Sequence, residues 1–174
     1  MSQLKVDSIV PRGGLASGFS GGIIQVKQDI KTDTSSISVS AGSETSALVS
    51  VAITPTSSSS KILLIGDLSG QLNDTGLFLK FFRGNTQIGM GDARGNRQRV
   101  STHLLTDQSF LMSSCSCTFL DSPSTTSSIT YSLRAGHTAP STQTIYINFP
   151  GANDPNQTQI CTGVTTLLAM EVTG

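Results

Sequence analysis

Apolar and polar residues alternate along most of this chain, and this alternation predicts its fold. Residues 48–54 (LVSVAIT), 128–133 (SITYSL) and 144–149 (TIYINF) carry a β-branched or aromatic side chain at every second position. A strand with one buried and one solvated face has this period. Residues 61–68 (KILLIGDL) and 76–82 (GLFLKFF) are apolar almost without a break. Such runs are typical of strands that a second sheet or another subunit covers on both faces.

Segments rich in Ser, Thr, Pro, Gly, Asn and Asp separate the predicted strands. They are residues 54–61, 121–128, 136–143 and 150–157, and their composition suits reversals of the chain. No stretch of a dozen residues combines helical spacing of apolar positions with helix caps. The sequence therefore predicts an all-β fold, an antiparallel β-sandwich of jelly-roll type with about eight strands.

The chain ends in a further alternating segment, residues 162–174. We expect this segment to form a long closing strand that holds the C-terminus in a sheet. One face of this strand would carry Val164, Thr166, Leu168, Met170 and Val172.

The first 22 residues differ from the rest. A short alternating segment, 4–10, is followed by chain with five glycines and no apolar pattern. Glycine-rich chain is flexible by default, so one interpretation is a disordered tail. The other is an extended attachment arm, 1–22, whose strand adds to a neighbouring subunit or a larger assembly, with 23–174 as the β-sandwich domain. The residues of this arm that carry the prediction are the apolar Leu4, Val6 and Ile9, and Pro11 and Arg12 of its PRGG hinge.

The charge of the chain argues against several partners. Its 174 residues include 11 basic and 11 acidic side chains, so its formal net charge is zero. A neutral protein lacks the long-range field that attracts nucleic acid. No run of apolar residues reaches the length of a membrane helix, and the N-terminus lacks the pattern of a secretory signal. We therefore expect a protein made in a cytoplasm, with neither a nucleic acid partner nor membrane insertion.

Hydroxyl groups take the place that charged groups hold on most surfaces. Only 13% of the residues are charged, whereas Ser and Thr make up roughly a quarter, well above ordinary globular usage. The chain has three cysteines, Cys115, Cys117 and Cys161. An odd number in a reducing compartment argues against a disulfide framework, and we expect all three to be small buried hydrophobic residues.

Three segments resemble parts of bacteriophage tail-fibre and other virion surface proteins, particularly those of phages of marine bacteria. They are LKVDSIVP at 4–11, ITPTSSSSKILLIG at 53–66 and FLDSPSTTSSITYSLRA at 119–135. This resemblance implies a β-sandwich module at the virion surface, usually a homo-oligomer and often a trimer, that is attached to other virion proteins through its N-terminal segment. The chain is short and has no repetitive shaft, so both a tail appendage and a capsid decoration remain open.

Two sets of residues are candidates for contacts. Phe78, Phe81 and Phe82 would point to both sides of their strand, so one side would pack the core. The other side, with Phe78 and Phe82, would meet a partner subunit, or a loop of the same chain would cover it. Arginines are concentrated in residues 88–99 (IGMGDARGNRQR), in a predicted loop: Arg94, Arg97 and Arg99.

The arginine loop has three interpretations. It is a solvated hairpin connection, or its guanidinium groups pair with carboxylates of another subunit, or they bind anionic groups of a host surface glycan. Under the last interpretation the protein is a host-binding adhesin, and Arg97 and Tyr146 would contribute to the ligand loops. The glycines of the arginine loop do not have the spacing of a dinucleotide fingerprint, and no predicted helix follows the loop to bind phosphate.

No group of residues predicts catalysis, a metal or a cofactor. His103 and His137 lack metal-ligand spacing, and we expect them to be exposed or simply hydrogen-bonded. Cys115 and Cys117 are one residue apart, which places them on one face of a strand but does not match a CxxC motif. A glycan depolymerase needs two facing carboxylates, and the aspartates fall mainly in predicted turns, where Asp121 would bond the backbone beside Pro123. The sequence predicts a protein that is not an enzyme.

Overall fold

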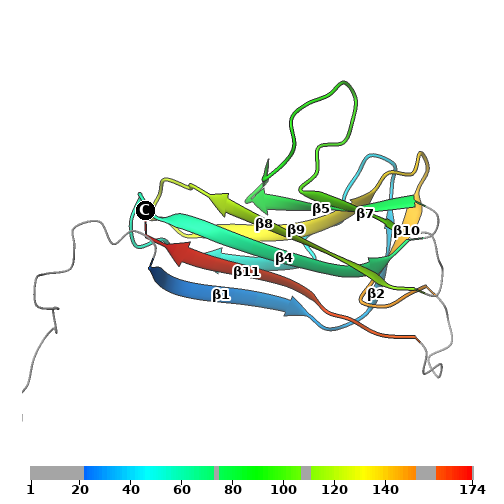
Figure 1. Cartoon of the computed structure of the whole chain (residues 1–174), viewed down its shortest axis with the longest axis horizontal. Coiled ribbons are helices and arrows are strands. Elements are labelled where there is room, and N and C mark those ends of the chain that lie inside the picture. Colours follow the sequence, from blue (N-terminus) through cyan, green and yellow to red (C-terminus); the bar gives the residue numbers. More distant parts are fainter. Residues whose placement is uncertain (1–21, 73–74, 107–110, 152–159, 174) are drawn as a thin grey trace, which may run out of the picture.

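The computed structural model describes residues 22–72, 75–106, 111–151 and 160–173. Within these residues the fold contains eleven strands and no helix. The strands form two antiparallel sheets that pack face to face (Figure 1). The predicted all-β sandwich is therefore confirmed.

The first sheet contains the strands that build the candidate site described below. Its path is β1-β11-β4-β10-β2, and β8 also pairs with β4. The strands are β1 (Ile23–Lys31), β2 (Ser35–Val39), β4 (Lys61–Gln71), β8 (Ser113–Asp121), β10 (Gln143–Ile147) and β11 (Thr165–Val172). Strand β4 is central because it pairs with β11, β8 and β10.

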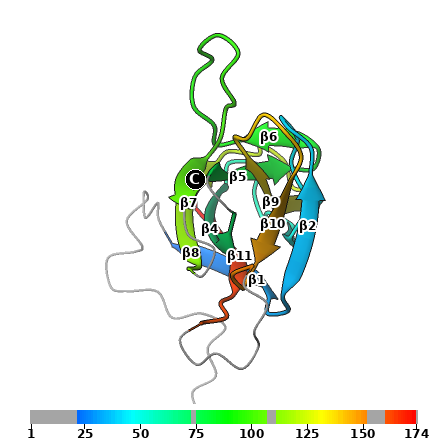
Figure 2. The same ribbon diagram turned by 90° about the vertical axis from the view of Figure 1, so that its right-hand side faces the viewer.

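The second sheet covers the inner face of the first. Its path is β3-β9-β5-β6. Strand β7 also pairs with β5, along residues 75–79, whereas β6 pairs with residues 81–83. The strands are β3 (Val49–Ile53), β5 (Thr75–Arg83), β6 (Thr86–Ile88), β7 (Thr102–Thr106) and β9 (Ile129–His137). A loop between β6 and β7 projects away from both sheets (Figure 2).

The core lies between the two sheets and is almost entirely aliphatic and aromatic. Alternate residues of each strand point into it, which is the arrangement that the period of two predicts. Its fully buried side chains include Ile62, Leu64, Leu68, Leu77, Leu79, Phe81, Tyr131, Leu133, Ile145 and Leu167.

The two sheets pack closely at a glycine of β4, Gly66. A Cβ atom at Gly66 would lie 2.8 Å from the Phe81 ring and 2.9 Å from the Leu133 side chain. Ordinary carbon contacts need about 3.5 Å or more, so a methyl group at this position has no room. This explains an uncharged, side-chain-free position in the middle of an apolar strand.

Gly66→Ala is expected to destabilise the fold by about 1–3 kcal/mol, because the added methyl group overpacks the core. The measurement is the free energy of unfolding in urea, followed by circular dichroism. Gly91→Ala is the matched control, since a Cβ atom at Gly91 has nothing within 4 Å. Equal stability of the two variants would contradict the close packing at Gly66.

The number of strands differs from the predicted number of about eight. The additional strands are short or polar, and β2 (SSISV) and β6 (TQI) contain few apolar residues. They hold their places through backbone pairing with β10 and β5. A pattern that relies on alternating apolar residues does not detect strands of this kind.

Candidate functional site

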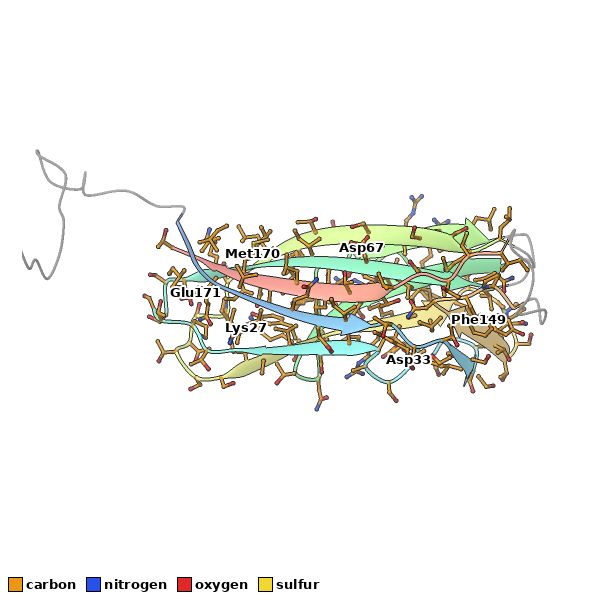
Figure 3. The ribbon with its side chains drawn as sticks, turned by 90° about the horizontal axis from the view of Figure 1, so that it is seen from below. Lys27, Asp33, Asp67, Phe149, Met170 and Glu171 are labelled. Atoms are coloured by element: carbon orange, nitrogen blue, oxygen red, sulfur yellow. The ribbon has the colours of Figure 1, made fainter. Side chains whose placement is uncertain are left out.

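The outer face of the first sheet carries a continuous group of apolar side chains. Strand register places them in rows that run across β1, β11, β4 and β8. One row is Val26, Met170, Leu63 and Leu120, and the next is Gln28, Leu168, Ile65 and Thr118. We call the apolar members of these rows, with Ile30 and Val172, the outer apolar face. Figure 3 views the molecule from the side of β1 and β11, with Met170 and Asp67 labelled.

The outer apolar face is accessible to solvent in the single subunit. Val26 is 51% exposed, Ile30 48% and Leu120 46%, while Leu63, Ile65, Leu168 and Met170 are partly exposed. Contiguous exposed apolar surface on a soluble protein commonly marks a site of interaction. This face is therefore the strongest candidate for a functional surface.

The inward and outward faces of β11 differ in composition. Its inward positions are Thr165, Leu167, Ala169 and Glu171. Its outward positions, which the sequence analysis grouped on one face, include Leu168, Met170 and Val172. The strand thus places a buried glutamate inside and larger apolar side chains outside.

The predicted contact residues Phe78 and Phe82 lie on the outer side of the second sheet, and the chain itself covers them. Phe78 is fully buried and Phe82 is 5% exposed. The Arg134 guanidinium carbon lies 4.0 Å from the centroid of the Phe82 ring, and the Lys80 ammonium lies 5.0 Å from that of Phe78. This arrangement corresponds to the alternative in which the same chain covers this side of the strand.

A loop and an ion pair complete this cover. Lys80 Nζ donates to Glu44 at 3.0 Å and to the Gln98 side-chain oxygen at 3.4 Å. Gln98 in turn donates to the Gly42 carbonyl at 3.2 Å. Segments that follow β2 and precede β7 are thereby tied together over the second sheet.

The arginine-rich segment forms the projecting loop in Figure 2, and residues 91–99 are exposed. Arg99 Nε donates to the Gly91 carbonyl at 2.7 Å, and the Arg97 amide donates to the Arg94 carbonyl at 3.4 Å. In the described parts of the chain, none of these arginines forms an ion pair with a carboxylate. Their side chains are exposed to solvent.

A cavity of about 540 Å³ lies where the base of the arginine loop meets the turn after β9. This volume falls within the range of small-molecule sites. The residues that line it include Phe78, Arg97, Gln98, Val100, His103 and Thr138. Tyr146, the other residue predicted for a ligand loop, instead lies in β10, with its ring edge-on to Phe149 at 5.5 Å.

Asp121 does not act as the predicted turn former. It ends β8 with a buried side chain, and its carboxylate accepts a hydrogen bond from the Tyr131 hydroxyl at 2.6 Å. Arg83 donates to both carboxylate oxygens, at 3.0 and 3.2 Å. Burial, and then the hydrogen bond to Asp121, raise the pKa of Tyr131. The turn prediction is wrong because Asp121 is still part of β8. Alternate residues of this strand, Cys115, Cys117 and Phe119, point inward, and Asp121 is the next in the series.

A second buried carboxylate, Glu171, is held by donors from two other segments. Thr56 donates its amide and hydroxyl to Oε1, both at 2.7 Å, and Gln25 donates its amide group to Oε2 at 2.6 Å. Burial alone raises the pKa of Glu171, but these hydrogen bonds, together with one from the Ser60 side chain, outweigh it and lower the pKa to about 2. Both buried carboxylates are thus occupied by structural hydrogen bonds.

The histidines and cysteines occupy separate environments. His137 is buried, with Nε2 2.8 Å from the Val39 carbonyl oxygen, whereas His103 is exposed. Cys115 is buried, and burial, followed by the nearby charge of Asp67, raises its pKa to about 12. Cys161 is exposed, so the prediction that all three cysteines are buried is wrong. No group of three potential metal ligands occurs among the described residues.

The predicted attachment arm, with Leu4, Val6, Ile9, Pro11 and Arg12, lies outside the described residues. Described chain begins at Gly22, whose carbonyl accepts a hydrogen bond from the Thr173 amide at 3.1 Å. Gly22 therefore lies beside the end of β11. Among the described residues, no helix has the length and apolar character needed to cross a membrane.

The sequence matches no protein-family model and no curated protein. Among solved structures, it is similar to structures of infectious bursal disease virus, strains Gt and Gx. The Gt structure shares 14% identity at a TM-score of 0.48, over 98% of this chain and 43% of the other. For Gx the values are 15% identity and 0.40, over 98% and 44%. The chain thus spans less than half of either viral chain, and neither likeness assigns it to a family.

Proposed function

We propose that this chain is a non-enzymatic structural protein of a virus particle, a surface-exposed β-sandwich module that self-associates through the outer apolar face. The observation that carries the proposal is the row Val26, Met170, Leu63 and Leu120, which is apolar across four strands and open to solvent. Covering such a face removes apolar area from water, which is the main driving force for association. Surfaces, rather than a catalytic cleft, are the working parts of the protein.

The hydrogen bonding of the two buried carboxylates supports a structural role. Asp121 accepts hydrogen bonds from Arg83 and Tyr131, and Glu171 accepts them from Thr56 and Gln25. Groups held in this way stabilise the fold and are not free to transfer protons. The proposal assigns catalysis to none of the described residues.

The bacteriophage resemblance supplies the setting of the proposal. In that setting the chain belongs to a tail-fibre-like appendage or a capsid decoration, and residues 1–22 attach it to other virion proteins. A homo-oligomer follows from the outer apolar face, and a trimer is the number that the resemblance implies. A closed trimer needs a contact between unlike surfaces, so the mass of the oligomer distinguishes it from a paired arrangement.

Val26→Lys is expected to weaken self-association by about tenfold or more, because it places a charge in the apolar row. Sedimentation velocity of the full chain over a range of concentrations measures the effect. Ala52→Lys is the matched control, since Ala52 is exposed on β3 of the other sheet. A wild-type chain that stays monomeric at every concentration would refute the proposed self-association.

Attachment to the particle is tested separately. The double variant Leu4→Ser with Val6→Ser is expected to self-associate normally but to be lost from purified particles, because the arm no longer offers apolar side chains to its partner strand. Quantitative mass spectrometry of the particles measures the loss. Ser2→Ala, at the start of the same arm, is the control. Absence of the wild-type chain from particles would contradict the virion role.

Binding of a host surface glycan is a second candidate function, and the cavity beside Arg97 and His103 favours it. Both are exposed residues that line the cavity, and a guanidinium can form two parallel hydrogen bonds with an anionic sugar group. Arg97→Gln is expected to abolish binding to an array of acidic glycans, whereas Arg94→Gln, outside the cavity lining, retains it. Equal binding by both variants would exclude this site.

A further inference from the structure

We propose that the partner of the outer apolar face is a second copy of this chain, packed face to face with the first. The two copies are related by a two-fold axis that lies between their outer apolar faces and runs at right angles to β4. This inference rests on the proposed function, because it specifies the arrangement behind the proposed self-association, and it gives a two-fold pair in place of the trimer that the bacteriophage resemblance implies. It follows from the positions of the two charged side chains on the outward side of β4.

Outward residues of β4 alternate with its buried residues and begin with Lys61, Leu63, Ile65 and Asp67. The two charges thus lie at opposite ends of an apolar pair, about 20 Å apart along the strand. In the described residues, neither Lys61 nor Asp67 forms an ion pair within the subunit. The face carries opposite charges that remain available to a partner.

A two-fold axis across β4 makes the two copies of this strand antiparallel. Lys61 of one copy then lies opposite Asp67 of the partner subunit, and the pair occurs twice because the contact is symmetric. Leu63 comes to lie opposite the partner's Ile65 in the middle of the interface. On β4, apolar and charged groups are therefore both matched.

The neighbouring strands obey the same operation. Met170 of β11 lies opposite the partner's Leu168, and Leu168 lies opposite the partner's Met170. A two-fold axis parallel to the strands would instead oppose Lys61 to Lys61 and Asp67 to Asp67. Because like charges facing each other disfavour an interface, the charges select the axis that crosses the strands.

The thickness of the contact is compatible with this pairing. Packed β-sheets lie about 10 Å apart, with side chains from both faces interdigitated. Leucine, isoleucine and methionine fill such a gap, and the flexible four-carbon stem of lysine reaches across it to a carboxylate. Lys61 is exposed and Asp67 is partly exposed, so both are able to make the contact.

A charge exchange tests the arrangement in the full chain. Lys61→Asp and Asp67→Lys are each expected to weaken self-association by about tenfold or more, because each opposes like charges at two places. The double variant Lys61→Asp with Asp67→Lys restores the pairing and is expected to return within a few-fold of wild type. Sedimentation velocity at low and high salt measures all four proteins, and thermal unfolding verifies that each is folded.

The outcomes separate this inference from the proposed function. Weak single variants and a restored double variant support the two-fold packing. Single variants that associate like wild type overturn it, as does a double variant that is as weak as either single variant. In those two cases, loss of association in Val26→Lys still supports the outer apolar face as the contact. A monomeric wild-type chain contradicts both proposals.

Discussion

Asp121→Ala is expected to lower the free energy of unfolding by about 2–4 kcal/mol, because it removes the acceptor of several buried hydrogen bonds. The Tyr131 side chain is fully buried, so its hydroxyl cannot turn to water when the carboxylate is lost. Arg83 loses its ion pair as well, although about a third of its side chain is exposed and can be rehydrated. The expected loss of stability is therefore smaller than it would be if the Arg83 charge were left fully buried.

Urea denaturation at neutral pH measures this loss. Asp92→Ala is the matched control, since Asp92 is an exposed residue of the projecting loop, and it is expected to change stability by less than about 0.5 kcal/mol. Tyr131→Phe, which keeps the ring and removes only the donor, is expected to fall between the two. A loss for Asp121→Ala as small as that of the control would show that the network does not stabilise the fold.

The environment of Asp121 also shows where reasoning from the sequence failed. The motif DSP has the composition of a turn, and a turn does follow, with Ser124 at a φ of 53°. Asp121 itself still belongs to β8, where its position is set by pairing with Ile62 of β4. Its partners, Arg83 and Tyr131, come from β5 and β9 of the other sheet. Only the packing of the two sheets brings these residues together.

Strands with a regular apolar alternation were predictable. The sequence indicated β3, β9 and β10 because their buried positions carry Val, Ile, Leu or Tyr. Strand β1 was missed because its inward residues are polar. Gln25 donates to Glu171, and Asp29 accepts a hydrogen bond from the Ser50 amide at 2.8 Å. The apolar residues of β1, such as Val26 and Ile30, lie on the outer side, and Gln28 interrupts their alternation.

The outer apolar face could be predicted only in part. Grouping Leu168, Met170 and Val172 on one face of the last strand is correct, but Leu167 and Ala169 make the opposite face apolar too. A strand with apolar residues on both sides does not indicate which side faces the core. The decisive signal is register, which places Met170 beside Leu63 of β4 and Val26 of β1. Such pairings of distant segments are a property of the folded chain.

Glu171 makes the stability of the fold depend on pH, because hydrogen bonds hold its carboxylate in the ionised form. Its pKa is lowered from 4.5 to about 2 in the folded chain, so the unfolded chain takes up a proton at this group more readily than the folded chain does. The group therefore contributes stability that is fully present above about pH 5, and this contribution is lost as the pH falls towards 2. Acidification should weaken the contacts between Glu171 and its donors, Thr56 and Gln25.

Glu171→Gln is expected to lower the free energy of unfolding by about 1–3 kcal/mol at pH 7, because an amide accepts weaker hydrogen bonds than a carboxylate and turns an NH₂ donor towards the donors of Gln25 or Thr56. The difference from wild type should shrink as the pH falls from 5 to 2.5, since wild type alone loses the contribution of this carboxylate. Urea denaturation of both proteins at several pH values measures the difference and cancels the other carboxylates. Asp92→Asn, at an exposed position of the projecting loop, controls for the loss of a surface charge. A difference that stays constant over this range would mean that hydrogen bonds from Gln25 and Thr56 do not hold Glu171 in its ionised form.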